Sequence, residues 1–390
     1  MLLRADYNVP LTKDGKVDDD YRLTQSLPTL QYLLERGCKL IICSHLGRPD
    51  GKIMPELSLE PVAARLGELL GRNVQFVPES IGDRVVQASK QLGAGQVILL
   101  ENLRFHAQEE ANDPAFARKL AADSGARYFV QDGFGVVHRA HASTVAITQY
   151  LPSVSGLLLE REYQQIEGAM ANPKRPLVAA LGGAKISDKI KLVERFVQLA
   201  DRIIIGGAMA NTFLAEKGVK IGRSVYEDDM ADTIKQIYAA IDSKVGPGQR
   251  DAFLTLPVDA AVATDTSAQG ERREVTLDQV GAEDMILDIG PRTIELMTQQ
   301  LQNAGTVIWN GTLGYAELPQ FAHGSARLAL ELAQHPQITS IIGGGDTADF
   351  VLKWDSRKGG SFTHVSTGGG ASLDLMAGDK LPGIEALMDA

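Results

Sequence analysis

The stretch Gly182-Gly183-Ala184-Lys185-Ile186-Ser187-Asp188-Lys189 stands between two segments whose apolar patterns differ in period. The run Pro176–Leu181 before it is apolar and has the length of a strand, whereas the apolar residues of Ile190–Ala200 after it recur at helical spacing. The stretch is therefore a glycine-rich turn from a strand into a helix, and its glycines allow a ligand to approach the backbone closely.

Lys185 and Lys189 are four residues apart, so they share a face if the helix begins early in this turn. The N-terminus of a helix attracts anions, and cations placed there do not stabilise the helix. We interpret the two lysines as ligands of a phosphate group. The alternative, two solvated surface charges, stays open for this spacing taken alone.

The composition limits the classes of protein to which the chain can belong. Its 390 residues predict two or three domains, and 44% apolar with 23% charged residues is typical of a soluble globular protein. Lys and Arg number 39 against 49 Asp and Glu, and the net charge of −10 argues against broad binding to nucleic acid or membrane surfaces. No apolar run reaches membrane-spanning length, and no signal-peptide pattern opens the chain. Cys38 and Cys43 fit buried, reduced thiols of a cytoplasmic protein.

The first half of the chain alternates predicted strands and helices, and polar residues follow several of the strands. The strand Leu2–Asn8 carries Asp6 and Asn8, the strand Lys39–Cys43 precedes His45, and Pro28 is predicted to start a helix. In a doubly wound parallel sheet, ligands bind beyond the carboxyl ends of the strands. This rule places the following residues on one rim: Asp6, Asn8, His45, Arg48, Arg104 and Arg139.

Arginine binds phosphate and carboxylate groups through two parallel hydrogen bonds, so a rim with three arginines predicts a site for a small, strongly anionic molecule. A single arginine after a strand is ordinarily a solvated charge, and this alternative holds for each of them taken separately. The long helix Leu157–Met170 is predicted to connect this half with the second.

The second half repeats the α/β pattern. Its predicted strands are Pro176–Leu181, Arg202–Ile205, Ala252–Leu256, Met285–Ile289, Thr306–Trp309, Ile338–Ile342 and Thr363–Val365. Glycine turns follow many of them and lead into helices, so several helix N-termini can point at one chain of phosphates. Asp346 lies in such a turn and suits Mg²⁺, which takes one or two carboxylates plus phosphate oxygens. Alternatively, Asp346 caps the helix that follows.

Other enzyme classes leave weaker traces. There is no G-x-x-x-x-G-K-[ST] motif, and the protein-kinase and nucleophile-elbow signatures are also absent. Gly343-x-Gly345-x-x-Ala348 matches a dinucleotide fingerprint without the acidic residue that should follow. Two rival functions therefore remain, an NAD-dependent oxidoreductase and a protein that only binds anions through the arginine rim.

Eight motifs in the same order resemble phosphoglycerate kinase along essentially the whole chain. They are Arg4-x-Asp6-Tyr7-Asn8-Val9-Pro10, Ser44–Pro49, Glu101–Phe105, His138–Ser143, Gly182–Lys189, Trp309-Asn310-Gly311, Gly343–Ala348 and Val365–Ser372. The resemblance implies two Rossmann-like three-layer αβα domains with parallel sheets, joined by a long helix and a hinge. It further implies reversible, Mg²⁺-dependent phosphoryl transfer between 1,3-bisphosphoglycerate with ADP and 3-phosphoglycerate with ATP, by in-line transfer after hinge closure.

The resemblance also implies the roles of individual residues. The 3-phosphoglycerate site comprises Asp6, Asn8, Arg22, His45, Leu46, Gly47, Arg48, Arg104 and Arg139. The nucleotide site comprises Gly183, Lys189, Gly206, Gly207, Asn310, Glu317, Gly344, Gly345, Asp346 and Thr347, with Asp346 on the magnesium. The residues implied in catalysis are Arg22, Lys185, Lys189, Gly345 and Gly368.

The domain division implied by the resemblance has four parts. Residues 1–156 bind 3-phosphoglycerate, 157–171 form the connecting helix, 172–378 bind the nucleotide, and 379–390 return to the first domain. A cytoplasmic monomer without nucleic-acid or membrane partners is expected. Departures from the family pattern lie mainly on the nucleotide side, at Asn211, Thr312 and Ala316, where an aromatic residue, a proline and a bulky residue are common.

Overall fold

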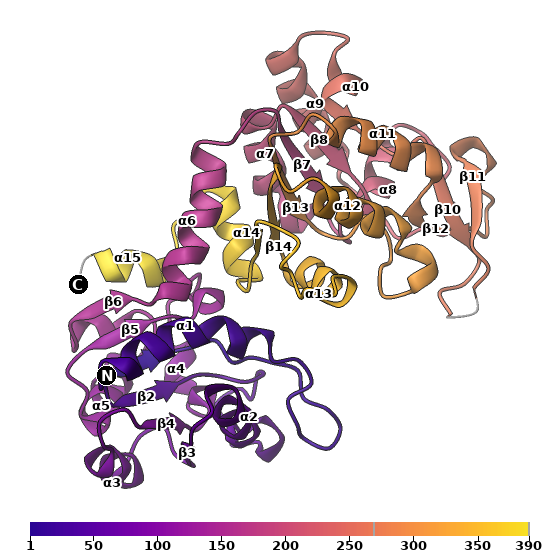
Figure 1. The fold of residues 1–390 in the computed structure, drawn as a ribbon. Coiled ribbons are helices and arrows are strands. Elements are labelled where there is room, and N and C mark those ends of the chain that lie inside the picture. The colour runs from indigo at the N-terminus through magenta and orange to yellow at the C-terminus, as the bar shows by residue number, and fades with distance from the viewer. Residues whose placement is uncertain (268–269, 389–390) are drawn as a thin grey trace. The chain divides into compact units, whose positions relative to one another are not determined.

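A computed structural model describes residues 1–267 and 270–388 (Figure 1). The chain divides into two compact units. Unit 1 is Met1–Gln164 together with the C-terminal segment that begins at Lys380, and unit 2 is Gln165–Asp379. The division falls within helix α6, Leu157–Ala171. None of the helices in the described part of the chain combines the length and the apolarity that crossing a bilayer requires.

Unit 1 contains a six-stranded sheet in which all neighbouring strands are parallel. The strand order is β3-β4-β2-β1-β5-β6. The strands are β1 (Leu2–Arg4), β2 (Leu40–Cys43), β3 (Val74–Val77), β4 (Val97–Leu100), β5 (Phe129–Gln131) and β6 (Ser153–Ser155). The helices of eight residues or more are α1 (Tyr21–Glu35), α2 (Glu60–Leu70), α3 (Asp83–Gln91) and α5 (Pro114–Ser124).

Alternation along the strands of unit 1 produces two separate apolar cores. Leu2 and Ile41 pack with residues of α3 and α5, whereas their neighbours Leu3 and Ile42 pack with residues of α1 and α2. Successive side chains of a strand point to opposite faces of the sheet, so helices cover both faces. Unit 1 therefore has the predicted three layers.

Helix α1 begins at Tyr21, about two turns before the predicted start at Pro28. Pro28 lies inside it, so the prediction that Pro28 starts the helix is wrong. Proline has no N–H and leaves one backbone carbonyl without its helical partner. Burial of Leu23, which lies before Pro28 and is fully inaccessible to solvent, helps to hold the additional residues in the helix.

Unit 2 has a second parallel sheet of six strands, in the order β15-β14-β13-β7-β8-β9. These strands are β7 (Leu177–Leu181), β8 (Arg202–Ile205), β9 (Leu254–Thr255), β13 (Thr306–Asn310), β14 (Thr339–Gly343) and β15 (His364–Val365). The longer helices are α7 (Ile190–Leu199), α8 (Gly207–Glu216), α9 (Ala231–Val245), α11 (Pro291–Leu301), α12 (His323–Gln334), α13 (Gly345–Trp354) and α14 (Gly370–Ala377). Every residue of the central strands β7 and β13 is buried.

A small antiparallel sheet in unit 2 was not expected from the sequence. It consists of β10 (Asp259–Ala263), β11 (Arg273–Thr276) and β12 (Met285–Ile289), with β10 in the middle. The predicted strand Met285–Ile289 therefore exists, but it pairs outside the parallel sheet. Antiparallel strands need no helical crossover, which agrees with the short connection between the paired strands β10 and β11.

Within unit 1, two loops make hydrogen bonds that hold the C-terminal helix and the start of α6 in place. Helix α15 (Pro382–Met388) follows Lys380, and Gly383 N donates a hydrogen bond of 2.8 Å to Val137 O. At the start of α6, Asp132 Oδ1 accepts hydrogen bonds from Thr29 Oγ1 at 2.8 Å and from Leu158 N at 3.0 Å. The carboxylate of Asp132 thus caps the N-terminus of α6 from within unit 1.

Candidate functional site

The predicted rim of unit 1 lies beyond four strands that are adjacent in the sheet, β4, β2, β1 and β5. Asp6 and Asn8 follow β1, the segment 45–48 follows β2, and Arg104 and Arg139 follow β4 and β5. Because these strands are parallel, their carboxyl ends share one edge. The structure therefore gathers the rim residues, and Arg22 joins them from the first turn of α1.

Hydrogen bonds hold most of the rim in place. Arg22 Nη1 donates to Asp6 Oδ2 at 2.8 Å, Gly47 N donates to Asn8 Oδ1 at 2.9 Å, and Arg104 Nη1 donates to Gly47 O at 2.8 Å. Three loops are thereby tied together. Arg22 keeps 28% of its side-chain area exposed, so it can still reach a ligand.

The remaining predicted rim residues differ in exposure. Arg48 and Arg139 are exposed to solvent, and Arg139 Nε lies 3.2 Å from His138 Nε2. The side chain of Leu46 belongs to the apolar core of unit 1 and its carbonyl accepts a hydrogen bond from Asn102 Nδ2 at 2.7 Å. Leu46 therefore shapes the loop from behind, whereas the two arginines face solvent.

A buried polar network behind the rim was not singled out from the sequence. Arg4 is fully buried on β1, and its Nε donates to Ser143 Oγ at 2.7 Å. Its Nη2 lies 3.2 Å from His45 Nδ1 and 3.9 Å from Glu109 Oε1. Glu109 in turn accepts a hydrogen bond of 3.0 Å from Ser143 N. A charged residue inside an apolar strand was the signal that could have revealed this network.

The network sets the protonation state of His45. Burial, and after it the positive charge of Arg4, lowers the pKa of His45 well below its usual value. His45 is thus neutral near pH 7, and its Nδ1 accepts a hydrogen bond from Arg4. The remaining proton is on Nε2, which makes His45 a neutral hydrogen-bond donor on a rim of cations.

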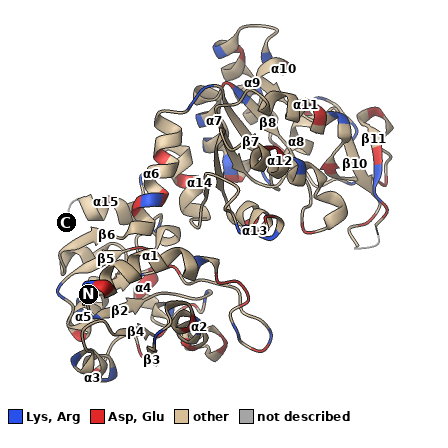
Figure 2. Ribbon diagram, in the orientation of Figure 1, with Lys and Arg blue, Asp and Glu red and all other residues tan. Residues whose placement is uncertain are grey.

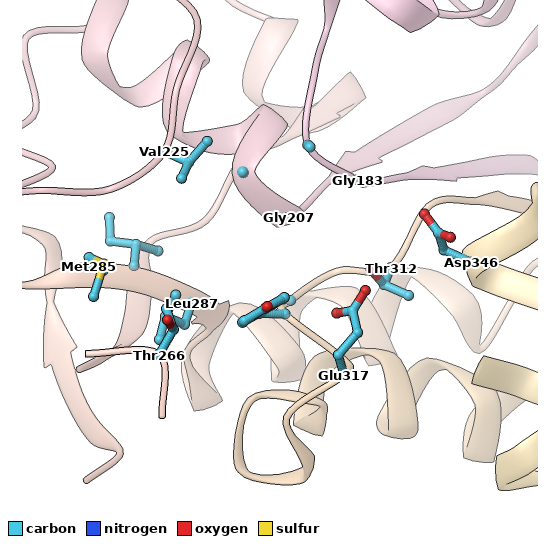
Figure 3. A pocket seen from close by; sticks show the side chains of 14 residues that line it. Gly183, Gly207, Val225, Thr266, Met285, Leu287, Thr312, Glu317 and Asp346 are labelled. Atoms are coloured by element: carbon cyan, nitrogen blue, oxygen red, sulfur yellow. The ribbon is translucent and has the colours of Figure 1, made fainter. Parts of the chain in front are cut away.

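Unit 2 contains a cavity of about 400 Å³ lined by Gly183, Gly207, Thr312, Glu317 and Asp346, all from the turns that follow strands or from the loop after β13. Figure 3 shows Val225 and Gly207 on one side of this cavity and Met285 and Leu287 on the other. The apolar walls suit a flat base, and the carboxylate of Glu317 suits sugar hydroxyls. The arrangement therefore fits a nucleotide.

Two glycines make the turns around this cavity possible. Gly207 has φ +64°, and a Cβ atom there would lie 2.7 Å from the backbone of Gly183. Gly183 itself has φ +97°. Residues with a side chain rarely adopt these angles, and a side chain at position 207 would clash with the backbone of Gly183. Gly206 N, next to Gly207, donates to Leu181 O at 2.8 Å and ties α8 to the end of β7.

Lys189 is held by backbone carbonyls. Its Nζ donates to Gly182 O at 2.7 Å and to Asn310 O at 3.2 Å. Burial lowers its pKa to about 8, although the nearby Asp346 and Asp188 favour the charged form. Lys185 is exposed. One lysine is therefore partly desolvated and fixed, and the side chain of the other is exposed to solvent.

Further polar groups of unit 2 lie at the N-terminus of α13. Asn310 Nδ2 is buried and has no hydrogen-bond partner among the described residues, and a Cβ atom on Gly344 would lie 3.0 Å from it. Thr347 Oγ1 accepts a hydrogen bond of 2.7 Å from Gly311 N. Gly345 is the first residue of α13, so the helix N-terminus is available to an anion.

Asp346 and Gly368 complete the predicted set. The carboxylate of Asp346 is exposed on the cavity wall, and one carboxylate with phosphate oxygens is a donor set that Mg²⁺ accepts. Within residues 1–267 and 270–388, no group of three or more His, Cys, Asp or Glu is placed to hold a metal ion. Gly368 N donates to Ser366 Oγ at 3.0 Å, just before α14 begins at Gly370.

Comparisons with known proteins agree on one family. Residues 1–379 match the family profile described as "Phosphoglycerate kinase". This chain belongs to the phosphoglycerate kinase family. The phosphoglycerate kinase of Koribacter versatilis is 46% identical over 395 residues, which cover 99% of this chain and 96% of the relative. That of Pelotomaculum thermopropionicum is 44% identical over 389 residues, covering 100% and 96% of the two chains.

Solved structures of the family have the same fold. Phosphoglycerate kinase from Coxiella burnetii superimposes with a TM-score of 0.84 at 36% identity, covering 100% of this chain and 95% of that one. The enzyme from Pyrococcus horikoshii OT3 has a TM-score of 0.84 at 33% identity, covering 99% and 95%. The two-domain α/β prediction is confirmed, and the oxidoreductase and the simple anion-binding protein are both excluded.

The activity follows from the family. The enzyme transfers a phosphoryl group reversibly between 1,3-bisphosphoglycerate with ADP and 3-phosphoglycerate with ATP, a step of glycolysis and gluconeogenesis. Lys and Arg lie among Asp and Glu in both units, so a net charge of −10 leaves room for local basic sites (Figure 2). The substrates are anions, which agrees with such sites.

Proposed function

We propose that unit 1 binds 3-phosphoglycerate and that unit 2 binds ADP or ATP. The observation that carries the assignment is the gathering of Arg22, Arg104, Arg48 and Arg139 at one edge of the unit 1 sheet, beyond β4, β2, β1 and β5. Phosphate and carboxylate groups are the anions that arginine forks bind best. The apolar cavity of unit 2, with Glu317 on its wall, supports the nucleotide assignment.

In unit 1, the hydrogen bonds of the rim support different roles for its arginines. Arg22 and Arg104 are already oriented by Asp6 and Gly47, so they bind the substrate without much loss of side-chain freedom. Arg48 and Arg139 are exposed and close on the phosphate when it arrives. Neutral His45 donates one hydrogen bond from Nε2 without adding a further charge.

In unit 2, the two lysines divide the phosphates between them. Lys189 contacts the phosphates of the bound nucleotide, and Lys185 contacts the phosphoryl group during transfer. Phosphoryl transfer requires positioning and charge neutralisation and no covalent enzyme intermediate. The N-terminus of α13 at Gly345 adds backbone N–H groups, and the turn at Gly368, whose own N–H is bonded to Ser366 Oγ, leads into the N-terminus of α14.

Asp346, with the nucleotide phosphates, would hold Mg²⁺. When bound, the ion neutralises phosphate charge and orients the phosphate chain. Because the proposed substrates bind to different units, the reaction requires closure of a hinge that brings acceptor and nucleotide together and excludes water. We propose a hinge near the ends of α6, at residues 153–156 and 172–173, and a monomeric enzyme in the cytoplasm, where Cys38 and Cys43 stay reduced.

Calorimetry on two single variants tests the assignment of substrates to units. Arg139→Ala should weaken 3-phosphoglycerate binding about tenfold, as expected when one exposed charge-assisted contact is lost, and should leave ADP binding unchanged. Glu317→Ala should do the reverse. Equal losses of both ligands in either variant would contradict the proposal.

A further inference from the structure

A carboxylate from a distant loop holds the turn that carries the two lysines. Glu227 Oε2 accepts hydrogen bonds from Ile186 N at 2.5 Å and from Ser187 N at 3.1 Å, and its Oε1 accepts one from the hydroxyl of Ser187. Glu227 lies 40 residues further along the chain than Ser187. We call this set of three hydrogen bonds the Glu227 clamp.

The clamp acts on backbone that has no cap of its own. The short helical turn Ser187–Lys189 has Ile186 at its N-cap, and the Ile186 side chain cannot cap the turn. The first N–H groups of a helix need partners from outside, and Glu227 supplies partners for two of them. Gly182 N and Gly183 N donate to Asn310 O at 3.0 Å and to Thr312 O at 2.9 Å, so backbone hydrogen bonds hold the chain before Lys185 and Glu227 holds the chain after it.

The loop that carries Glu227 is itself anchored to α8. Glu227 N donates to Thr212 Oγ1 at 3.2 Å, and Asn211 Nδ2 donates to Val225 O at 3.0 Å. Both anchoring residues are buried. Val225 lines the nucleotide cavity, so one short loop contributes a wall of this cavity and the clamp on the lysine turn.

The side chain of Glu227 is a carboxylate and not a carboxylic acid near neutral pH. Burial would raise the pKa of Glu227, but the hydrogen bonds from Ser187 and Ile186 and the charge of Lys185 outweigh it and lower the pKa. The negative charge therefore lies beside the N-terminus of a helical turn and near a lysine, where both stabilise it.

We propose that Glu227 is a positioning residue for phosphoryl transfer, which fixes the backbone at Ile186 and Ser187 and thereby sets where Lys185 can reach. This inference rests on the proposed role of Lys185. Its alternative is a purely structural role, in which the clamp adds stability and the position of Lys185 does not depend on it. A positioning role acts on turnover, because a displaced charge loses more stabilisation in the transition state than in the bound ground state.

Steady-state kinetics on a set of variants separate these roles. Glu227→Ala should lower kcat about tenfold or more while leaving KM for 3-phosphoglycerate unchanged. Glu227→Gln should restore most of kcat, because Oε1 can still accept both N–H groups and Nε2 can donate to Ser187 Oγ. Asp232→Ala removes a carboxylate of the same unit that is 93% exposed and serves as the control, with kcat expected to stay unchanged.

A double variant shows whether Glu227 acts through Lys185. If it does, Glu227→Ala should cause little further loss in a Lys185→Ala background. Normal kcat in Glu227→Ala together with a large loss in Lys185→Ala would refute the positioning role of Glu227 and leave the proposed function intact. Normal kcat in Lys185→Ala would instead overturn the proposed role of that lysine. Multiplying losses in the double variant would show that Glu227 acts by another route, which also refutes the inference.

Stability and folding are followed on the same samples. Circular dichroism and ADP calorimetry should show a folded protein with near-normal ADP affinity for Glu227→Ala. If this variant does not fold, Glu227→Asp keeps the charge but is one methylene shorter, and the same loss of kcat at unchanged KM is expected. A folded Glu227→Asp with wild-type kcat would refute a positioning role.

Discussion

The pKa of Lys189 predicts that ADP affinity falls with rising pH. Burial lowers this pKa to about 8, and the only partners of Nζ that are hydrogen-bonded in the described structure are the carbonyls of Gly182 and Asn310. Below this pKa the amine carries the charge that attracts nucleotide phosphates, and above it the amine is neutral. Raising the pH from 7 to 9 is therefore a perturbation that removes one charge from the site.

The size of the effect follows from the fraction of Lys189 that is protonated. With a pKa of about 8, this fraction falls from about 0.9 at pH 7 to about 0.1 at pH 9, so ADP affinity should fall about tenfold. Binding should also take up protons above pH 8, because the phosphates raise the pKa of the lysine in the complex. The contribution of Lys189 to the free energy of unfolding changes with pH in the opposite direction to ADP affinity. The folded-state pKa is lowered, so burial of Lys189 costs least at high pH.

Isothermal titration calorimetry at pH 7 and 9, in two buffers that differ in ionisation enthalpy, measures the ADP affinity and the number of protons taken up on binding. Lys189→Met is the control, because it keeps an unbranched side chain of similar length and has no titrating group. The variant should bind ADP at pH 7 at least as weakly as the unmodified enzyme does at pH 9, because it carries no charge at any pH. Identical pH dependence in the enzyme and in Lys189→Met would refute the assignment of Lys189 to the phosphates.

Two further predictions concern the start of α6 and the proposed hinge. Burial raises the pKa of Asp132 to about 6, so the stability that protonated Asp132 provides is lost as pH rises from its unfolded pKa through its folded one. Relative to Asp132→Asn, the enzyme should lose about 1.4 kcal/mol of unfolding free energy between pH 5 and 8, as measured by urea denaturation. A difference in unfolding free energy between the two proteins that stays constant over this pH range would contradict the prediction. Small-angle scattering should show a smaller radius of gyration with both substrates and Mg²⁺ than with either alone. Identical profiles in all states would rule out hinge closure.

Much of the fold and of the candidate site could be predicted from local patterns. Apolar runs of strand length, glycine turns and helical spacing are properties of neighbouring residues, so they identified the strand before Gly182 and the helix after Lys189. Parallel pairing then places every residue that follows a strand on the same edge. The family resemblance added the proposed roles of residues such as Asn310 and Gly368, which the patterns alone left open.

Other features depended on contacts between residues far apart in the sequence. Tertiary packing kept Pro28 inside α1 and moved Met285–Ile289 into an antiparallel sheet. It also buried Arg4 against Ser143 and Glu109 behind the rim. Local propensity says nothing about such contacts, because their free energy arises only when the partners are brought together.

The sequence by itself thus determined which residues can bind anions and on which edge of a sheet they lie. Only the tertiary structure decided the strand order that makes four of these loops neighbours, the desolvation that brings Lys189 to a pKa of about 8, and the clamp from Glu227. The physical reason is that charge type is a property of each residue, whereas desolvation and hydrogen-bond geometry are properties of its surroundings.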